Sequence, residues 1–211
     1  PLVNGQFYYA TTVDPPCESN DRLEVLVNIY EPNDAGNDGS RDICSNQVMT
    51  TPLFDLYNLL GGTPDNTGVW SGPIGTTNGF QGTLDVSSMT EAGSPYVFTY
   101  TVSSALCVTD TSTVTISILP LPTASVTANP TTICQNGTTT LTFTGTPNAT
   151  VTYNINGGTN QTITLNAAGT ATISVSPTTT GTINIVSVAS SGNPSCVNLQ
   201  TSSIPITVLP L

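Results

Sequence analysis

Five cysteines carry most of the reactive chemistry in this sequence, which has no histidine. Cys44 and Cys107 lie roughly 60 residues apart, and the same separation recurs between Cys134 and Cys196. In each pair the first cysteine precedes an early predicted strand, and the second lies in the turn between the last two strands. The spacing therefore predicts disulfides Cys44–Cys107 and Cys134–Cys196, each clipping one end of a domain. Cys17 is expected to stay unpaired within this sequence.

Disulfide bonding is favoured over the other roles that cysteines play. A zinc site is disfavoured, because the sequence has neither a Cys-x-x-Cys pair nor a histidine. Buried free thiols are the alternative. Closing a loop of about 60 residues stabilises a domain by on the order of 4 kcal/mol in the chain-entropy model. Disulfides also indicate an oxidising compartment outside the cytoplasm.

An acidic segment follows the first strands of the chain. Asp34, Asp38 and Asp42, together with Asn33 and Asn37, offer the hard oxygen ligands that calcium prefers. A calcium ion held there would stiffen a joint between domains. We favour the alternative of a solvated polar turn, because the spacing matches no calcium loop. No other cofactor is expected.

Composition excludes several classes of function. The chain has 13 acidic and two basic residues and a net charge of −11, so nucleic acid is an unsuitable partner. No apolar run approaches 18 residues, so no membrane insertion is expected. Without histidine there is no Ser-His-Asp or Cys-His machinery, and no Gly-x-Ser-x-Gly or phosphate-binding glycine loop occurs. We therefore predict no catalytic residues and no enzyme activity.

Four aromatic residues in the middle of the chain admit two readings. Phe54, Tyr57, Trp70 and Phe80 could form a platform on which sugar rings stack, or they could belong to a core. The core reading is the commoner fate of large aromatic residues in a small β domain.

The elements that must position these residues repeat along the chain. Ile43-Cys44-Ser45-Asn46 recurs about 90 residues later as Ile133-Cys134-Gln135-Asn136. A period of this length predicts tandem domains. We expect the C-terminal hairpin of a preceding repeat at 1–32, one repeat at 33–120 and another at 121–211. The sequence therefore reads as a piece of a longer chain.

The predicted secondary structure is β throughout. Residues 139–144 alternate polar and apolar side chains, as a half-buried strand does. Residues 151–155 and 161–165 flank an Asn-Gly pair, which is a strong hairpin signal. Residues 54–60 fit either a strand or a short helix. Short strands at regular spacing predict tandem Ig-like β-sandwiches arranged in a rod.

Two segments also resemble a known family. Residues 54–73, Phe-Asp-Leu-Tyr-Asn-Leu-Leu-Gly-Gly through Trp-Ser-Gly-Pro, resemble the repeat of SprB-type gliding-motility adhesins. Residues 132–141, Thr-Ile-Cys-Gln-Asn-Gly-Thr-Thr-Thr-Leu, resemble the start of Ig-like or PKD-like repeats in such adhesins. The resemblance implies export by the type IX secretion system and display on the bacterial cell surface, outside the outer membrane. It implies no catalytic residues.

The expected function follows from the repeats and the resemblance together. They indicate stalk or spacer repeats of a very large extracellular adhesin that acts in surface adhesion and gliding. The expected partners are neighbouring repeats of the same chain, with surface glycans or the gliding machinery as further partners. The alternative is an accessory or carbohydrate-binding β-sandwich of a secreted polysaccharide-degrading enzyme. An exposed row of aromatic residues would favour that alternative, and a buried Trp70 would favour the spacer.

Overall fold

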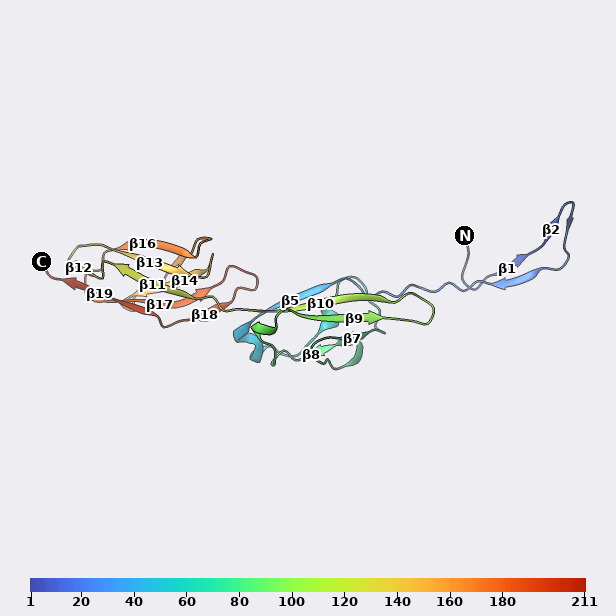
Figure 1. Ribbon diagram of the computed structural model, residues 1–211, viewed down its shortest axis with the longest axis horizontal. Coiled ribbons are helices and arrows are strands. Elements are labelled where there is room, and N and C mark those ends of the chain that lie inside the picture. Colours follow the sequence, from blue (N-terminus) through green and yellow to red (C-terminus); the bar gives the residue numbers. More distant parts are fainter. The chain divides into compact units, whose positions relative to one another are not determined.

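The computed structural model describes residues 1–211, apart from the side chain of Asp14, and the chain is almost entirely β (Figure 1). The all-β prediction is confirmed. The chain divides into two compact units. The first comprises Pro1–Gly39, Asp55–Thr83 and Phe98–Val114, and the second comprises Ser40–Phe54, Leu84–Val97 and Thr115–Leu211. The predicted domain limits, 1–32, 33–120 and 121–211, stay predictions.

Two sheets form the larger part of the second unit. One has the order β11 (Ala124–Asn129), β13 (Thr139–Gly145), β16 (Thr170–Val175). The other has the order β12 (Thr132–Cys134), β19 (Ser203–Leu209), β17 (Gly181–Ala189), β14 (Thr150–Ile155), β15 (Gln161–Thr164), and β18 (Val197–Leu199) adds to β17.

This strand order is that of an immunoglobulin-like sandwich. β11, the first strand of the domain, pairs antiparallel with β13 in one sheet. The chain then crosses to the other sheet, where β12 pairs parallel with the last strand, β19. β17 then pairs antiparallel with both β14 and β19. Immunoglobulin-like domains separate their strands between two sheets in the same way. The Ig-like fold class is therefore confirmed for this domain.

Alternating side chains explain why these strands pack face to face. In β13, Leu141 and Phe143 are buried, whereas Thr144 on the opposite face is exposed. The ring of Phe143 lies 4.9 Å from that of Tyr153 in β14, which joins the two sheets through the core. Each large apolar side chain buried in this way contributes about 1.5–3 kcal/mol. The core of this sandwich consists of Val126, Ile133, Leu141, Phe143, Ala149, Val151, Tyr153, Leu165, Ile183, Ile185, Val188 and Ile206.

The middle of the chain contains shorter elements. A four-stranded sheet has the order β5 (Gly39–Cys44), β10 (Asp110–Leu119), β9 (Tyr96–Val102), β7 (Val69–Ser71). A two-stranded sheet joins β6 (Phe54–Asp55) to β8 (Thr83–Leu84). Four 3₁₀ helices connect them: η1 (Ser45–Thr50), η2 (Leu56–Leu59), η3 (Gly79–Gln81) and η4 (Glu91–Gly93). The segment 54–60 is thus a two-residue strand followed by a helical turn.

The first 30 residues form the expected hairpin. β1 (Phe7–Ala10) pairs antiparallel with β4 (Leu23–Leu26), and β2 (Val13–Asp14) pairs with β3 (Cys17–Glu18) nearer the turn. The apolar side chains of this hairpin are exposed, among them Phe7, Tyr9, Leu23 and Val25. None of the helices in the described part of the chain has the length and apolar character needed to span a membrane.

Candidate functional site

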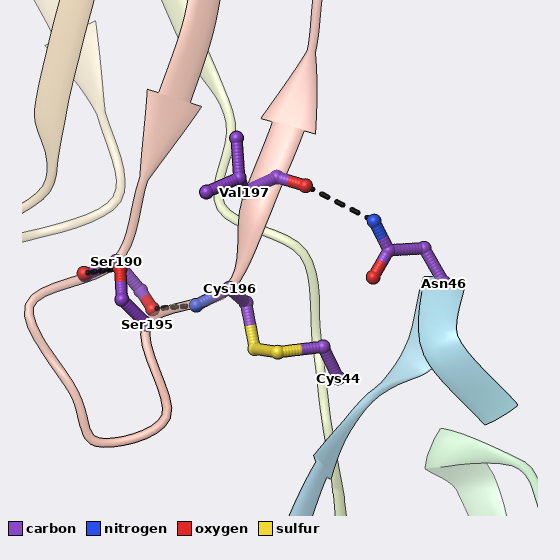
Figure 2. The surroundings of a disulfide bond; sticks show 6 residues. All are labelled: Cys44, Asn46, Ser190, Ser195, Cys196 and Val197. Carbon is purple, nitrogen blue, oxygen red and sulfur yellow. Dashed lines mark hydrogen bonds between the residues drawn. A yellow bond between two sulfur atoms is a disulfide. The ribbon is translucent and has the colours of Figure 1, made fainter. Parts of the chain in front are cut away.

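The only disulfide among the described residues joins Cys44 to Cys196, with the two Cα atoms 5.5 Å apart (Figure 2). Both cysteines are fully buried, and both belong to the second unit. Cys17, Cys107 and Cys134 are free in the structure as described. The bond corrects both predicted pairs, Cys44–Cys107 and Cys134–Cys196. It links the second sequence repeat to the third instead of closing a loop inside each.

Strand register explains why Cys134 and Cys196 do not meet. Cys134 is paired with Leu209 of β19. Gly181, the first residue of β17, is paired with Ile206 of β19, so Cys134 lies beyond this end of β17. Cys196 directly precedes Val197, which is paired with Ala189 at the other end of β17. The length of β17 puts about 26 Å between the two ends. A disulfide requires Cα atoms within about 7 Å, so this pair cannot form.

The direction of β5 explains the other wrong pair. Asp38, just before β5, accepts a hydrogen bond from the backbone N–H of Thr113, so β5 starts beside the beginning of β10. Cys107 lies upstream of that point, where its thiol contacts the carbonyl oxygen of Glu31. Cys44 is the last residue of β5, about 17 Å further along the strand. Cys44 and Cys107 therefore lie toward opposite ends of β5.

A compact turn holds Cys196 in place for Cys44. The Ser190 hydroxyl accepts a hydrogen bond from the Cys196 N–H at 2.9 Å, and the Ser195 hydroxyl donates to the Ser190 carbonyl at 2.7 Å (Figure 2). The Ser190 N–H also donates to the Cys196 carbonyl at 2.9 Å. These bonds close the turn on itself, so that the sulfur of Cys196 is presented in a fixed position.

A second contact lies beside the disulfide. The side-chain amide of Asn46, in the first turn of η1, donates to the carbonyl oxygen of Val197 at 3.0 Å (Figure 2). Asn46 is the last residue of the repeated Ile-Cys-x-Asn frame. The frame therefore supplies a covalent bond through its cysteine and a hydrogen bond through its asparagine.

The acidic residues proposed for calcium make ordinary protein contacts. A carboxylate oxygen of Asp34 accepts the N–H of Gly36 at 2.8 Å, and Asp38 accepts the N–H of Thr113 at 2.7 Å. Asp42 is exposed on β5. Within the described residues, no group of three or more acidic, cysteine or histidine side chains could hold a metal ion. The calcium site at Asp34, Asp38 and Asp42 stays a prediction without structural support.

Three of the four aromatic residues pack into the core of the first unit. The rings of Tyr57 and Phe80 meet edge to face at 5.2 Å, and Trp70 lies 4.8 Å from the ring of Tyr100. The indole N–H of Trp70 donates to the carbonyl of Phe80 at 2.8 Å. Phe54, Tyr57, Trp70 and Phe80 are all at least half-buried, so they offer no exposed aromatic row. This is the core reading of these residues.

The remaining aromatic residue is covered by a cation. The guanidinium carbon of Arg41 lies 4.1 Å from the centroid of the Phe54 ring. A cation over an aromatic face is attracted by the ring quadrupole. The face of Phe54 under Arg41 is therefore already occupied.

Tyr100 anchors the aromatic cluster through its hydroxyl group. The hydroxyl donates to the carbonyl of Asp65 at 2.6 Å and accepts the N–H of Gly68 at 3.0 Å. The side chain is fully buried, and burial raises the pKa of Tyr100 above its usual value. The aromatic cluster is thus a structural feature that fixes the loop 65–68 against β9.

Comparisons with known proteins give structural similarity alone. No family model and no curated protein matches the chain. Among solved structures, a Ca²⁺-stabilised ice-binding adhesin of an Antarctic bacterium is 18% identical, with a TM-score of 0.40 over 96% of this chain and 56% of that one. The D00–D0 domain of intimin is also 18% identical, with a TM-score of 0.28, covering 67% of this chain and 76% of that one. The first eight Ig domains of the cell adhesion molecule DSCAM are 12% identical, with a TM-score of 0.42, covering 99% of this chain and 32% of that one. The chain thus spans little more than half of the first of these structures, and at these TM-scores none of them contributes to the assignment of function.

Proposed function

We propose that this chain forms stalk repeats of a large extracellular adhesin, where it spaces and presents other parts of the molecule. The observation that carries the proposal is the Cys44–Cys196 bond, which fastens one sequence repeat to the next. A linkage of this kind serves a protein whose repeats must stay together outside the cell. Disulfides persist in oxidising, extracellular settings.

The surface of the Ig-like sandwich supports the same proposal. From residue 111 onward the chain contains no charged side chain at all. Its exposed strand faces are rich in threonine, which suits a pleated sheet surface. Such a face offers a ligand no charged side chain, which fits a spacer better than a receptor.

The finer assignment rests on the resemblance of residues 54–73 and 132–141 to SprB-type repeats. On that basis we propose display on the bacterial surface through the type IX secretion system and a role in gliding motility. The neighbouring repeats of the same chain are the first partners. Surface glycans and the gliding machinery are proposed as partners of the whole adhesin.

The size and exposure of the natural polypeptide test the proposal. An antibody to residues 33–211 would be used to blot source cells before and after mild surface proteolysis. A stalk predicts a band of several hundred kilodaltons that disappears on proteolysis. A band the size of one enzyme plus these repeats would contradict the proposal and support an accessory module of a secreted polysaccharide-degrading enzyme.

A further inference from the structure

The setting of Cys196 recurs around Cys107, about 90 residues earlier. Cys196 lines a hollow between the proline-rich linker 119–122 and the turn that carries the cysteine. Cys107 lines a hollow between linker residues 30–33 and its own turn. In each case a linker that contains proline enters a repeat beside the turn of the closing hairpin. The two hollows therefore occupy equivalent places in consecutive repeats, each within a single unit of the fold.

The two turns share one type of local hydrogen bond. A serine hydroxyl accepts the N–H of each cysteine, from Ser190 to Cys196 at 2.9 Å and from Ser104 to Cys107 at 3.3 Å. The difference lies in the sulfur atoms. Cys196 is bonded and buried, whereas Cys107 is a partly exposed thiol whose nearest polar contact is the carbonyl of Glu31 at 3.2 Å. The turns differ in length, since the serine lies six residues before Cys196 and three residues before Cys107.

The other half of the disulfide recurs as well. Ile43 and Ile133 are both buried, so each frame is anchored in the core by its isoleucine. After the cysteine the two frames differ, since Asn46 lies in the helix η1 whereas Asn136 lies in a turn with a φ of 66°. Cys44 is buried and bonded, whereas Cys134 is exposed and free. Both asparagines of the frames are exposed, and Asn46 donates a hydrogen bond to the Val197 carbonyl. Cys134 is thus the free and exposed counterpart of the bonded Cys44.

We propose that Cys134 and Cys107 are half-sites of the same inter-repeat disulfide that Cys44 and Cys196 complete. Cys134 bonds the closing-turn cysteine of a repeat that follows it, and Cys107 bonds the Ile-Cys-x-Asn cysteine of a repeat that precedes it. The partner is another repeat of this kind in the same polypeptide. This inference rests on the proposed function for the existence of further repeats, whereas the extended chain described below tests the bond by itself.

The bond forms by thiol–disulfide exchange with a disulfide oxidant such as oxidised glutathione. The thiolate of Cys134 attacks the oxidant, forming a mixed disulfide and releasing one glutathione thiolate. The thiolate of the partner cysteine then attacks the mixed disulfide at the Cys134 sulfur and releases the second glutathione. Two cysteine thiols are oxidised, two electrons reduce the glutathione disulfide, and the two protons end on the two glutathione thiols.

A tandem extension of the natural chain tests the proposal. A second copy of residues 122–211 is appended after Leu211, because Leu209-Pro210-Leu211 matches Leu119-Pro120-Leu121 and the linker is thereby continued. In this chain Cys134 and the added copy of Cys196 are again 152 residues apart, the separation of the observed bond. The chain is oxidised with glutathione, its free thiols are alkylated, and peptides from a non-tryptic digest are mapped by mass spectrometry.

We expect a linked peptide pair that contains Cys134 and the added Cys196, within a monomeric chain and beside an intact Cys44–Cys196 pair. In the matched variant Cys134→Ser, the added Cys196 should become alkylated, while Cys44–Cys196 and the circular dichroism spectrum stay unchanged. Full alkylation of Cys134 in the extended chain, with Cys44–Cys196 intact, would overturn the proposal. A Cys134 bond found only in covalent dimers would equally overturn it, because the partner would then be a second molecule.

Discussion

Cys44 and Cys196 are the residues whose loss should cost the second unit most. The bond joins positions 152 residues apart, and a loop longer than 100 residues is worth about 5 kcal/mol in the chain-entropy model. We expect Cys44→Ser to lower the free energy of unfolding of the second unit by up to about 5 kcal/mol. Cys134→Ser should leave it unchanged, because Cys134 is exposed and free. Urea unfolding under non-reducing conditions measures both, and equal effects of the two variants would contradict the assigned pair.

Tyr100 gives a second prediction for a single residue. Tyr100→Phe removes the hydroxyl between the Asp65 carbonyl and the Gly68 N–H, leaving both backbone groups without their partner. A loss of about 1–3 kcal/mol is expected for unsatisfied buried groups. Tyr30→Phe, at an exposed tyrosine, is the control. Thermal unfolding of the three proteins measures the difference, and a Tyr100→Phe variant as stable as the control would contradict the structure.

The same tyrosine predicts a response to alkaline pH. Burial raises the pKa of Tyr100, so the folded state holds the phenolic proton more tightly than the unfolded state. The contribution of this proton to stability is complete below the unfolded pKa of about 10 and is lost as pH rises through the higher folded value. We expect stability to fall above about pH 10, with a smaller fall in Tyr100→Phe. Urea unfolding at a series of alkaline pH values would measure it.

At the scale of elements, β13 is the strand on which the Ig-like core depends. Phe143→Ala should destabilise the second unit by about 3–5 kcal/mol, because it leaves a cavity between the two sheets beside Tyr153. Thr144→Ala changes the next residue, which lies on the exposed face, and should cost less than about 0.5 kcal/mol. Urea unfolding compares the two, and similar losses would mean that β13 is shifted by one residue.

Strand periodicity explains how much of the fold could be predicted from sequence. Residues 139–144 alternate, and the strand β13 has the predicted inward and outward faces. Residues 151–155 and 161–165 flank Asn-Gly, and β14 and β15 pair there as a hairpin. Residues 54–60 carried no clear period, because a two-residue strand and one helical turn are both too short to show one.

The cysteine pairing shows why the site was harder to predict. Similar spacing suggested that Cys44 and Cys107 were equivalent to Cys134 and Cys196, and this equivalence between repeats is supported by their surroundings. Spacing, however, says nothing about which end of a strand a residue occupies. The parallel register of β12 on β19 puts Cys134 at the far end of the sandwich from Cys196. Only that long-range pairing decides which cysteines can meet.

At the scale of the whole molecule, the acidic charge is confined to residues 14–110. Because Asp34 and Asp38 already accept backbone hydrogen bonds and no described cluster could hold a metal ion, we expect the melting temperature to be the same with calcium and with a chelator. Calorimetry in both buffers at equal ionic strength measures this. A rise with calcium that Asp34→Asn abolishes would restore the predicted site.

The disulfide also determines how the chain would respond to being pulled from its two ends. Tension entering at Cys44 would cross to Cys196 through the sulfur atoms, so the residues between them would lie off the load path. A backbone of that length measures about 500 Å when fully stretched. A single-molecule extension trace of the oxidised protein should therefore fall short of its contour length by about this distance, and a reducing agent should release it.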